Sequence, residues 1–128
     1  MADVNRGNRP LSPHLQIYRL PLTAKLSILF RITGVGMTLG ALLVVWRFAA
    51  GAISPEASAT ADAVLTSWLG NLVMLGSLWA LIFHACNGIR HLVWDSGHGF
   101  ELETVEKANY AVIGGSVVLT LIFVALIV

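Results

Sequence analysis

The chain has 128 residues, of which 56% are hydrophobic and only 12% are charged, and its mean hydropathy is +0.77. A soluble domain carries about 25% charged residues, so this composition excludes an ordinary soluble domain and indicates an all-α membrane protein. The net charge of +1 and the lack of a basic patch with interleaved aromatic residues argue against nucleic acid as a partner. The single cysteine, Cys86, excludes an internal disulfide framework, and no Cys-x-x-Cys-His motif for c-type haem attachment occurs.

Prolines and apolar runs divide this single membrane-anchor domain, residues 1–128, into an arm and three spans. Residues 1–21 form an arm without a continuous helix, because its prolines would interrupt one. We expect this arm to lie in the cytoplasm. Three transmembrane helices are expected, over residues 22–50, 64–94 and 108–128. A short loop over residues 51–63 and an acidic connector over residues 95–106 join them.

Two arginines bound the centre of the first span. Only fifteen residues separate Arg31 from Arg47, about 22 Å of helix, whereas a hydrocarbon core needs about twenty residues. One arginine must therefore snorkel or lie at membrane depth. We expect Arg47 to snorkel outward and Arg31 to be held inside with a partner. Between them, Gly36 and Gly40 form a Gly-x-x-x-Gly pair that allows another helix to approach closely.

The distribution of basic residues predicts the orientation. Five of them precede or begin the first span: Arg6, Arg9, Arg19, Lys25 and Arg31. The loop over residues 51–63 has none. The positive-inside rule therefore places the N-terminus in the cytoplasm and the C-terminus outside, which brings Arg31 and His91 to the same cytoplasmic side.

The second span carries the clearest candidate site. His84, Gly88 and His91 are four and three residues apart, so they share one helix face. Ionisable groups at membrane depth are costly and usually functional. His84 suits an axial ligand of a b-type haem, with a side-chain-free patch for a planar cofactor at Gly88 and a polar group at His91. The alternative is an interhelical hydrogen bond. A six-coordinate haem would need its second histidine from another chain, because this chain has no other buried histidine.

Two further pairs of polar residues admit a functional and a structural interpretation. Ser27 and Arg31, four residues apart, suit a quinone carbonyl whose negative charge grows on reduction, and Arg31 could also bind a haem propionate. The pattern alone favours a snorkelling arginine and a serine bonded to its own helix. Arg90 and His91 could anchor propionates, but the pattern favours a marker of the membrane interface. Trp79 and Cys86 are expected to pack in the core.

Three segments carry family motifs. They are residues 9–18 (Arg-Pro-Leu-Ser-Pro-His-Leu-x-Ile-Tyr), 27–34 (Ser-Ile-x-x-Arg-x-x-Gly) and 84–97 (His-x-x-x-Gly-Ile-Arg-His-Leu-x-Trp-Asp-x-Gly). In sequence and in order they resemble the cytochrome b membrane-anchor subunits of succinate dehydrogenase, of the alphaproteobacterial and mitochondrial type. Many members carry a histidine just before the first-helix arginine, where this chain has Phe30, so a propionate contact from that histidine is missing.

The resemblance implies a respiratory complex in a bacterial inner membrane. Its flavoprotein subunit holds FAD, its iron–sulfur subunit passes electrons inward, and two three-helix anchor subunits form a bundle that binds haem b and reduces ubiquinone. His84 is then the axial ligand to the haem iron, with the second ligand from the other anchor. Ser27 and Arg31 line the quinone pocket, and Arg31, Gly88 and His91 support the haem and its propionates.

Three other functions compete with a haem- and quinone-binding subunit. A purely structural anchor for soluble redox subunits would bind no cofactor and would tolerate leucine at His84. A fumarate reductase anchor would share the same features, since the direction of electron flow depends on the quinone potential. A small transporter is disfavoured because three spans without internal repeats give no inverted halves.

Overall fold

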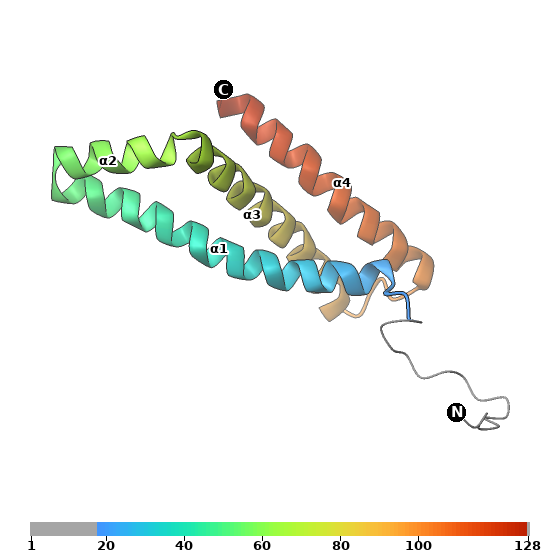
Figure 1. Ribbon diagram of the computed structural model, residues 1–128. Coiled ribbons are helices and arrows are strands. Elements are labelled where there is room, and N and C mark those ends of the chain that lie inside the picture. The colour runs from blue at the N-terminus through green and yellow to red at the C-terminus, as the bar shows by residue number, and fades with distance from the viewer. Residues whose placement is uncertain (1–17, 128) are drawn as a thin grey trace, which may run out of the picture.

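The computed structural model describes residues 18–127 and contains four helices (Figure 1). They are α1 (Leu22–Ile53), α2 (Pro55–Leu65), α3 (Trp68–Asp95) and α4 (Leu102–Ile127). Three of them, α1, α3 and α4, are long and apolar enough to cross a membrane, which agrees with the predicted number of spans. The motif at residues 9–18, apart from Tyr18, and nearly all of the predicted arm lie outside the described residues.

The three long helices pack most closely at one end of the molecule. Helix α1 runs away from this end, α2 folds back beside its last turns, and α3 returns to where α1 began (Figure 1). Helix α4 then leads away again and contacts both α3 and α1. The core at this end contains Leu26 of α1, Phe83 of α3 and Val112 of α4. Trp79 and Cys86 pack against it, as predicted.

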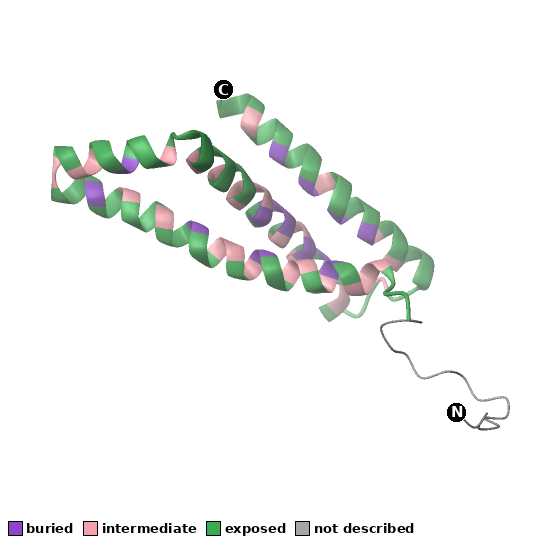
Figure 2. Ribbon diagram, viewed as in Figure 1, coloured by how far each residue is buried: buried purple, intermediate pink, exposed green. Residues whose placement is uncertain are grey.

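The interior contains polar side chains beside its apolar core, and the surface is largely apolar, unlike the surface of a soluble protein. Six buried side chains carry polar groups: Thr33, Asn87, Arg90, Asn109, Ser116 and Thr120. Many large apolar side chains are exposed, for example Phe48 at 75% and Leu126 at 78%. Figure 2 shows exposed positions along all the helices. Polar residues of membrane helices face the bundle interior, because lipid cannot satisfy them. The distribution therefore matches a protein surrounded by lipid or by other membrane subunits.

The predicted loop over residues 51–63 was wrong, because most of this segment is helix α2. The Ser54 hydroxyl accepts the Ala57 N–H at 3.1 Å and caps the helix, and Pro55 occupies its first turn. Backbone hydrogen bonding and the Ser54 side chain lower the pKa of the Glu56 carboxyl in this first turn, so this capping arrangement weakens as the pH falls. A search for membrane-length apolar runs overlooks such a short, alanine-rich helix.

Helix α2 also changes the environment of Arg47. Its Nε donates to Oδ1 of Asp62 at 2.5 Å, and a second guanidinium nitrogen donates to Oδ2 at 3.0 Å. Arg47 therefore does not simply snorkel outward; it forms a bidentate ion pair with α2. The pair is exposed and holds α2 alongside the end of α1.

Other helix ends also differ from the predicted spans. Helix α3 begins at Trp68, capped by the Ser67 hydroxyl, which accepts the Gly70 N–H at 3.1 Å. A Cβ atom at Gly70 would lie 2.2 Å from the Val64 carbonyl oxygen, so this tight turn requires glycine. Helix α4 begins at Leu102, before the predicted start, because its first turns carry charges that an apolar-run search leaves out.

Replacing Gly40 with alanine is expected to weaken the packing of α1 against α3. A Cβ atom there would lie 2.9 Å from the Ser77 Oγ and 3.1 Å from its Cβ. The new contact should cost about 1–3 kcal/mol, measured as a lower melting temperature of the purified complex in detergent.

Gly36→Ala is the matched control, since a Cβ atom at Gly36 meets nothing within 4 Å. Gly40→Ala combined with Ser77→Gly should recover more of the loss than Gly40→Ala with Ser77→Ala, because only glycine removes both the Oγ and the Cβ contacts. Equal melting temperatures for Gly36→Ala and Gly40→Ala would contradict the close approach at Gly40.

Candidate functional site

The predicted ligand His84 lies half-buried on α3, against one face of α1. The Phe30 ring stacks on its imidazole, with ring centroids 3.9 Å apart and an interplanar angle of 16°. The Nδ1 atom lies 3.4 Å from the Thr33 Oγ1. A Cβ atom at Gly34 would lie 3.4 Å from His84 Cε1, so Gly34 allows the imidazole to approach α1. The ring is fixed on one side, and its Nε2 forms no hydrogen bond with any residue in the range 18–127.

Gly88 and His91 lie further along α3, as predicted from their spacing. A Cβ atom at Gly88 would meet nothing within 4 Å, so the surface one turn beyond His84 is open. His91 contacts Phe30, with centroids 5.4 Å apart, and meets Trp94 edge-on at 5.2 Å. Phe30 therefore touches both histidines. Phe30, which stands where many similar sequences have a histidine, thus lies next to the imidazole rings of both His84 and His91.

Ser27 and Arg31 lie one turn apart on α1. Ser27 is half-buried and Arg31 is exposed. Neither forms a hydrogen bond or an ion pair with another residue between Tyr18 and Ile127. The partner expected for Arg31 is thus absent from the described part of this chain, and the guanidinium is free there for a ligand or another subunit.

Arg90 lies inside the bundle and not on its lipid-facing surface. Only 6% of it is exposed. It donates a hydrogen bond to Oδ1 of Asn109 on α4, and its guanidinium lies 4.6 Å from the centre of the Trp94 ring. Asn109 in turn donates to the Thr23 Oγ1 at 2.9 Å. These contacts join α3, α4 and α1 through one buried polar network.

Sequence reasoning missed Asn87, Asn109 and Thr33. Asn87 is fully buried, and no described residue bonds with its amide. A usable signal existed for α4, where Asn109, Ser116 and Thr120 recur on one face of an otherwise apolar helix. Thr33 offered no such signal, because its role depends on how α1 and α3 are placed against each other.

The arrangement fits a haem ligand but not a metal site made by the described residues alone. No group of three or more His, Cys, Asp or Glu residues that could hold a metal ion occurs within the described residues. His84 offers an immobilised ring with an uncommitted nitrogen, next to the open surface at Gly88. His91 lies about 10 Å further along the helix, too far to complete the same axial pair. Within residues 18–127, His84 therefore has no second histidine close enough to share one metal ion with it.

Comparison with known proteins covers nearly the whole chain. A sequence model of the succinate dehydrogenase/fumarate reductase transmembrane subunit family matches residues 5–123. The succinate dehydrogenase cytochrome b556 subunit of Paracoccus denitrificans is 54% identical over 122 residues, which are 95% of this chain and 94% of that protein. The cytochrome b560 subunit of Reclinomonas americana is 38% identical over 120 residues, 90% of this chain and 83% of the relative.

A mitochondrial relative extends the comparison to animals. The succinate dehydrogenase cytochrome b560 subunit of Sus scrofa is 33% identical over 111 residues, which are 84% of this chain and 64% of that protein. Bacterial and mitochondrial proteins thus share the same extended match, as the motifs predicted. The chain therefore belongs to the succinate dehydrogenase/fumarate reductase transmembrane subunit family.

Proposed function

We propose that this chain is the haem b subunit that anchors succinate dehydrogenase in the membrane and contributes to ubiquinone reduction. The observation that carries the proposal is the His84 imidazole, held by Phe30 and Thr33 with Nε2 uncommitted. The relatives above are named as cytochrome b subunits of succinate dehydrogenase, which favours this activity over fumarate reduction. A pyridine haemochrome assay on the co-purified complex tests it: we expect haem b in stoichiometric amount, and its absence would leave only a structural anchor.

His84 would hold the haem iron through Nε2, which has no hydrogen-bond partner among residues 18–127. Haem b, when bound, supplies a one-electron redox centre whose potential depends on its ligands and their hydrogen bonds. A second histidine would come from the partner anchor subunit. Gly88 leaves room for the flat macrocycle, since nothing lies within 4 Å of a Cβ atom built there. Arg31 and His91 would bind the propionates, which is supported by the contact between His91 and Phe30, the neighbour of Arg31 in sequence.

Ser27 and Arg31 contribute to the ubiquinone site. The Ser27 hydroxyl can donate a hydrogen bond to a quinone carbonyl, and the Arg31 guanidinium can stabilise the negative charge that grows on its oxygen during reduction. Both are free of other described partners, and Arg31 is exposed on the surface of the single chain. The site would therefore lie where this chain meets another subunit.

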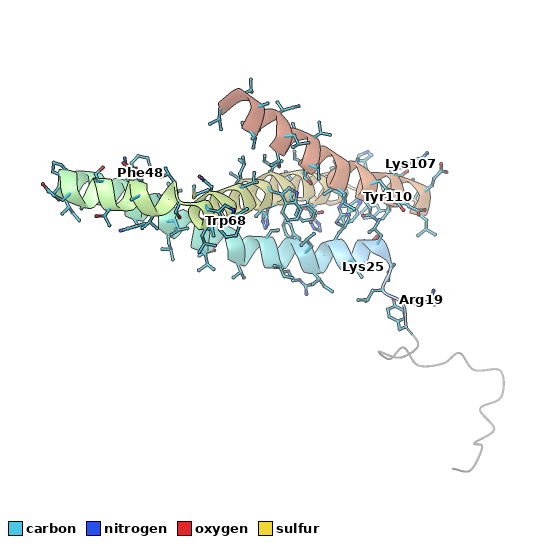
Figure 3. The ribbon with its side chains drawn as sticks, turned by 45° about the horizontal axis from the view of Figure 1, so that its top comes forward. Arg19, Lys25, Phe48, Trp68, Lys107 and Tyr110 are labelled. Carbon is cyan, nitrogen blue, oxygen red and sulfur yellow. The ribbon has the colours of Figure 1, made fainter. Side chains whose placement is uncertain are left out.

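The surface of the helices indicates further subunits around this chain. Most large apolar side chains of α1, α3 and α4 are exposed, more than packing within one chain would leave. A second three-helix anchor and membrane lipid would cover them. Arg19, Lys25 and Lys107 lie at the same end of the molecule (Figure 3). By the positive-inside rule this end faces the bacterial cytoplasm, where the iron–sulfur and flavoprotein subunits would dock on the inner membrane.

Ser27→Ala and Arg31→Leu are expected to impair ubiquinone reduction selectively. Loss of one donor to a developing oxyanion lowers kcat by about a hundredfold or more in sites that exclude water. Because Arg31 is exposed, we expect a smaller fall in kcat here, of about tenfold. The measurement is succinate:ubiquinone reductase activity of the purified complex, compared with succinate oxidation by a soluble dye.

The dye-coupled activity is the internal control, because it bypasses the membrane site. Thr38→Val serves as the matched variant, since Thr38 is an exposed hydroxyl residue of α1 that donates only to the Gly34 carbonyl. Unchanged quinone kinetics in both Ser27→Ala and Arg31→Leu would remove these residues from the quinone site.

A further inference from the structure

We propose that Thr33 is a positioning residue that fixes the tautomer of His84 and thereby lowers the reduction potential of the haem; this inference rests on the proposed function. The Thr33 hydroxyl has one hydrogen, and it donates that hydrogen to the Phe30 carbonyl at 2.9 Å. Its oxygen therefore faces the His84 Nδ1, 3.4 Å away, with lone pairs only. A hydrogen bond then forms only if Nδ1 carries the ring hydrogen, which leaves the lone pair on Nε2.

The residues around Thr33 and His84 stabilise this hydrogen bond. Thr33 is 4% exposed, so water has little access to replace it as the acceptor. Phe30 covers one face of the imidazole, and the absence of a side chain at Gly34 lets the ring edge reach α1. Hydrogen bonds in such a low-dielectric interior are stronger than in water. The imidazole of His84 on α3 is thus positioned by three residues of α1: Phe30, Thr33 and Gly34.

The hydrogen bond also affects the electronic properties of the ligand. A metal-bound histidine that donates its other ring N–H to an acceptor is a more basic ligand with a fixed orientation. A more basic imidazole favours the oxidised iron over the reduced iron. Thr33 therefore holds the haem potential lower than an apolar residue of the same shape would.

Thr33→Val tests this inference in the complete complex, because valine keeps the shape and removes the hydroxyl. We expect the haem to remain bound and its midpoint potential to rise in an optical redox titration. The ratio of reduced to oxidised haem at a fixed ambient potential should increase about tenfold, which is about 59 mV for a one-electron couple. Thr33→Ser should restore the wild-type potential, because it keeps the oxygen.

Thr38→Val is the matched control, since Thr38 also donates to a backbone carbonyl of α1, at 3.2 Å, but has no histidine contact in the described structure. A wild-type potential in Thr33→Val, or the same shift in Thr38→Val, would overturn the inference. If Thr33→Val fails to assemble, the pair Thr33→Ser and Thr33→Ala decides, and equal potentials in these two would overturn it.

The proposed function fails separately from this inference. If His84→Ala retains wild-type haem content and spectrum, His84 is not the ligand and the proposed function is wrong. If His84→Ala loses the haem while Thr33→Val keeps the wild-type potential, only the role of Thr33 is wrong.

Discussion

His84→Ala is expected to lose most of its haem b, at least about tenfold per purified complex. The histidine is the haem ligand that we propose for this chain, and Phe30 and Thr33 hold it in one orientation. Loss even of residues that merely support a metal ligand reduces metal affinity about 10–100-fold, so loss of the ligand itself should cost no less. Any haem that remains should lose its six-coordinate spectrum. The pyridine haemochrome assay and the Soret and α bands of the complex measure both effects.

His98→Ala is the matched control for this prediction. His98 lies in the exposed turn after α3, where its Nδ1 lies 3.1 Å from the Ser96 hydroxyl, far in sequence from the buried contacts of His84. Its haem content and spectrum should equal those of the wild type. Wild-type haem in both His84→Ala and His84→Leu would mean that His84 serves only as an interhelical contact.

Asn109→Leu is expected to destabilise the complex by about 3 kcal/mol. The substitution removes the acceptor for Arg90, a residue that is only 6% exposed and whose Nε has no described partner. Hydrogen bonds to buried charged groups contribute about 1.5–3 kcal/mol, and removal of one partner of a buried pair costs about 3–5 kcal/mol. The melting temperature of the complex in detergent measures the loss.

Two companion variants separate the causes. Thr23→Val reports the part that comes from the second hydrogen bond of Asn109. The double variant Arg90→Met with Asn109→Leu should recover much of the stability, because no unpaired charge remains in the interior. Glu103→Ala, which breaks the exposed ion pair with Lys107 on the same helix, should change the melting temperature little. Equal effects of Asn109→Leu and Glu103→Ala would contradict the buried network.

The three long helices could be predicted because hydrophobicity over a membrane-length window is a local property of the sequence. The same criterion overlooked α2, whose capping by Ser54 and alanine-rich composition are also local but give no apolar run. The ion pair of Arg47 was not predicted for a related reason. Its partner Asp62 lies on a segment that was taken for a loop, so the bidentate pair had no predicted counterpart.

The candidate site likewise contains features that one helix determines and features that depend on how two helices pack. His84, Gly88 and His91 could be aligned from helical periodicity alone, and Gly88 is open as that alignment required. The roles of Thr33 and Asn109 depend on the rotation and register of one helix against another, which a single sequence does not contain. Arg90 shows the consequence most clearly. Its place near a helix end predicts an arginine at the membrane interface. In the structure Arg90 is buried and donates a hydrogen bond to Asn109, nineteen residues later in the chain.

The most direct test is a structure of the intact complex by electron cryomicroscopy, with the distance from His84 Nε2 to the haem iron as the measured quantity. We expect Nε2 at coordination distance from the iron, with Nδ1 directed at the Thr33 hydroxyl and the second ligand from the partner anchor. A His84 ring beyond bonding distance of any metal, packed only against apolar side chains, would contradict a haem-binding role for this chain.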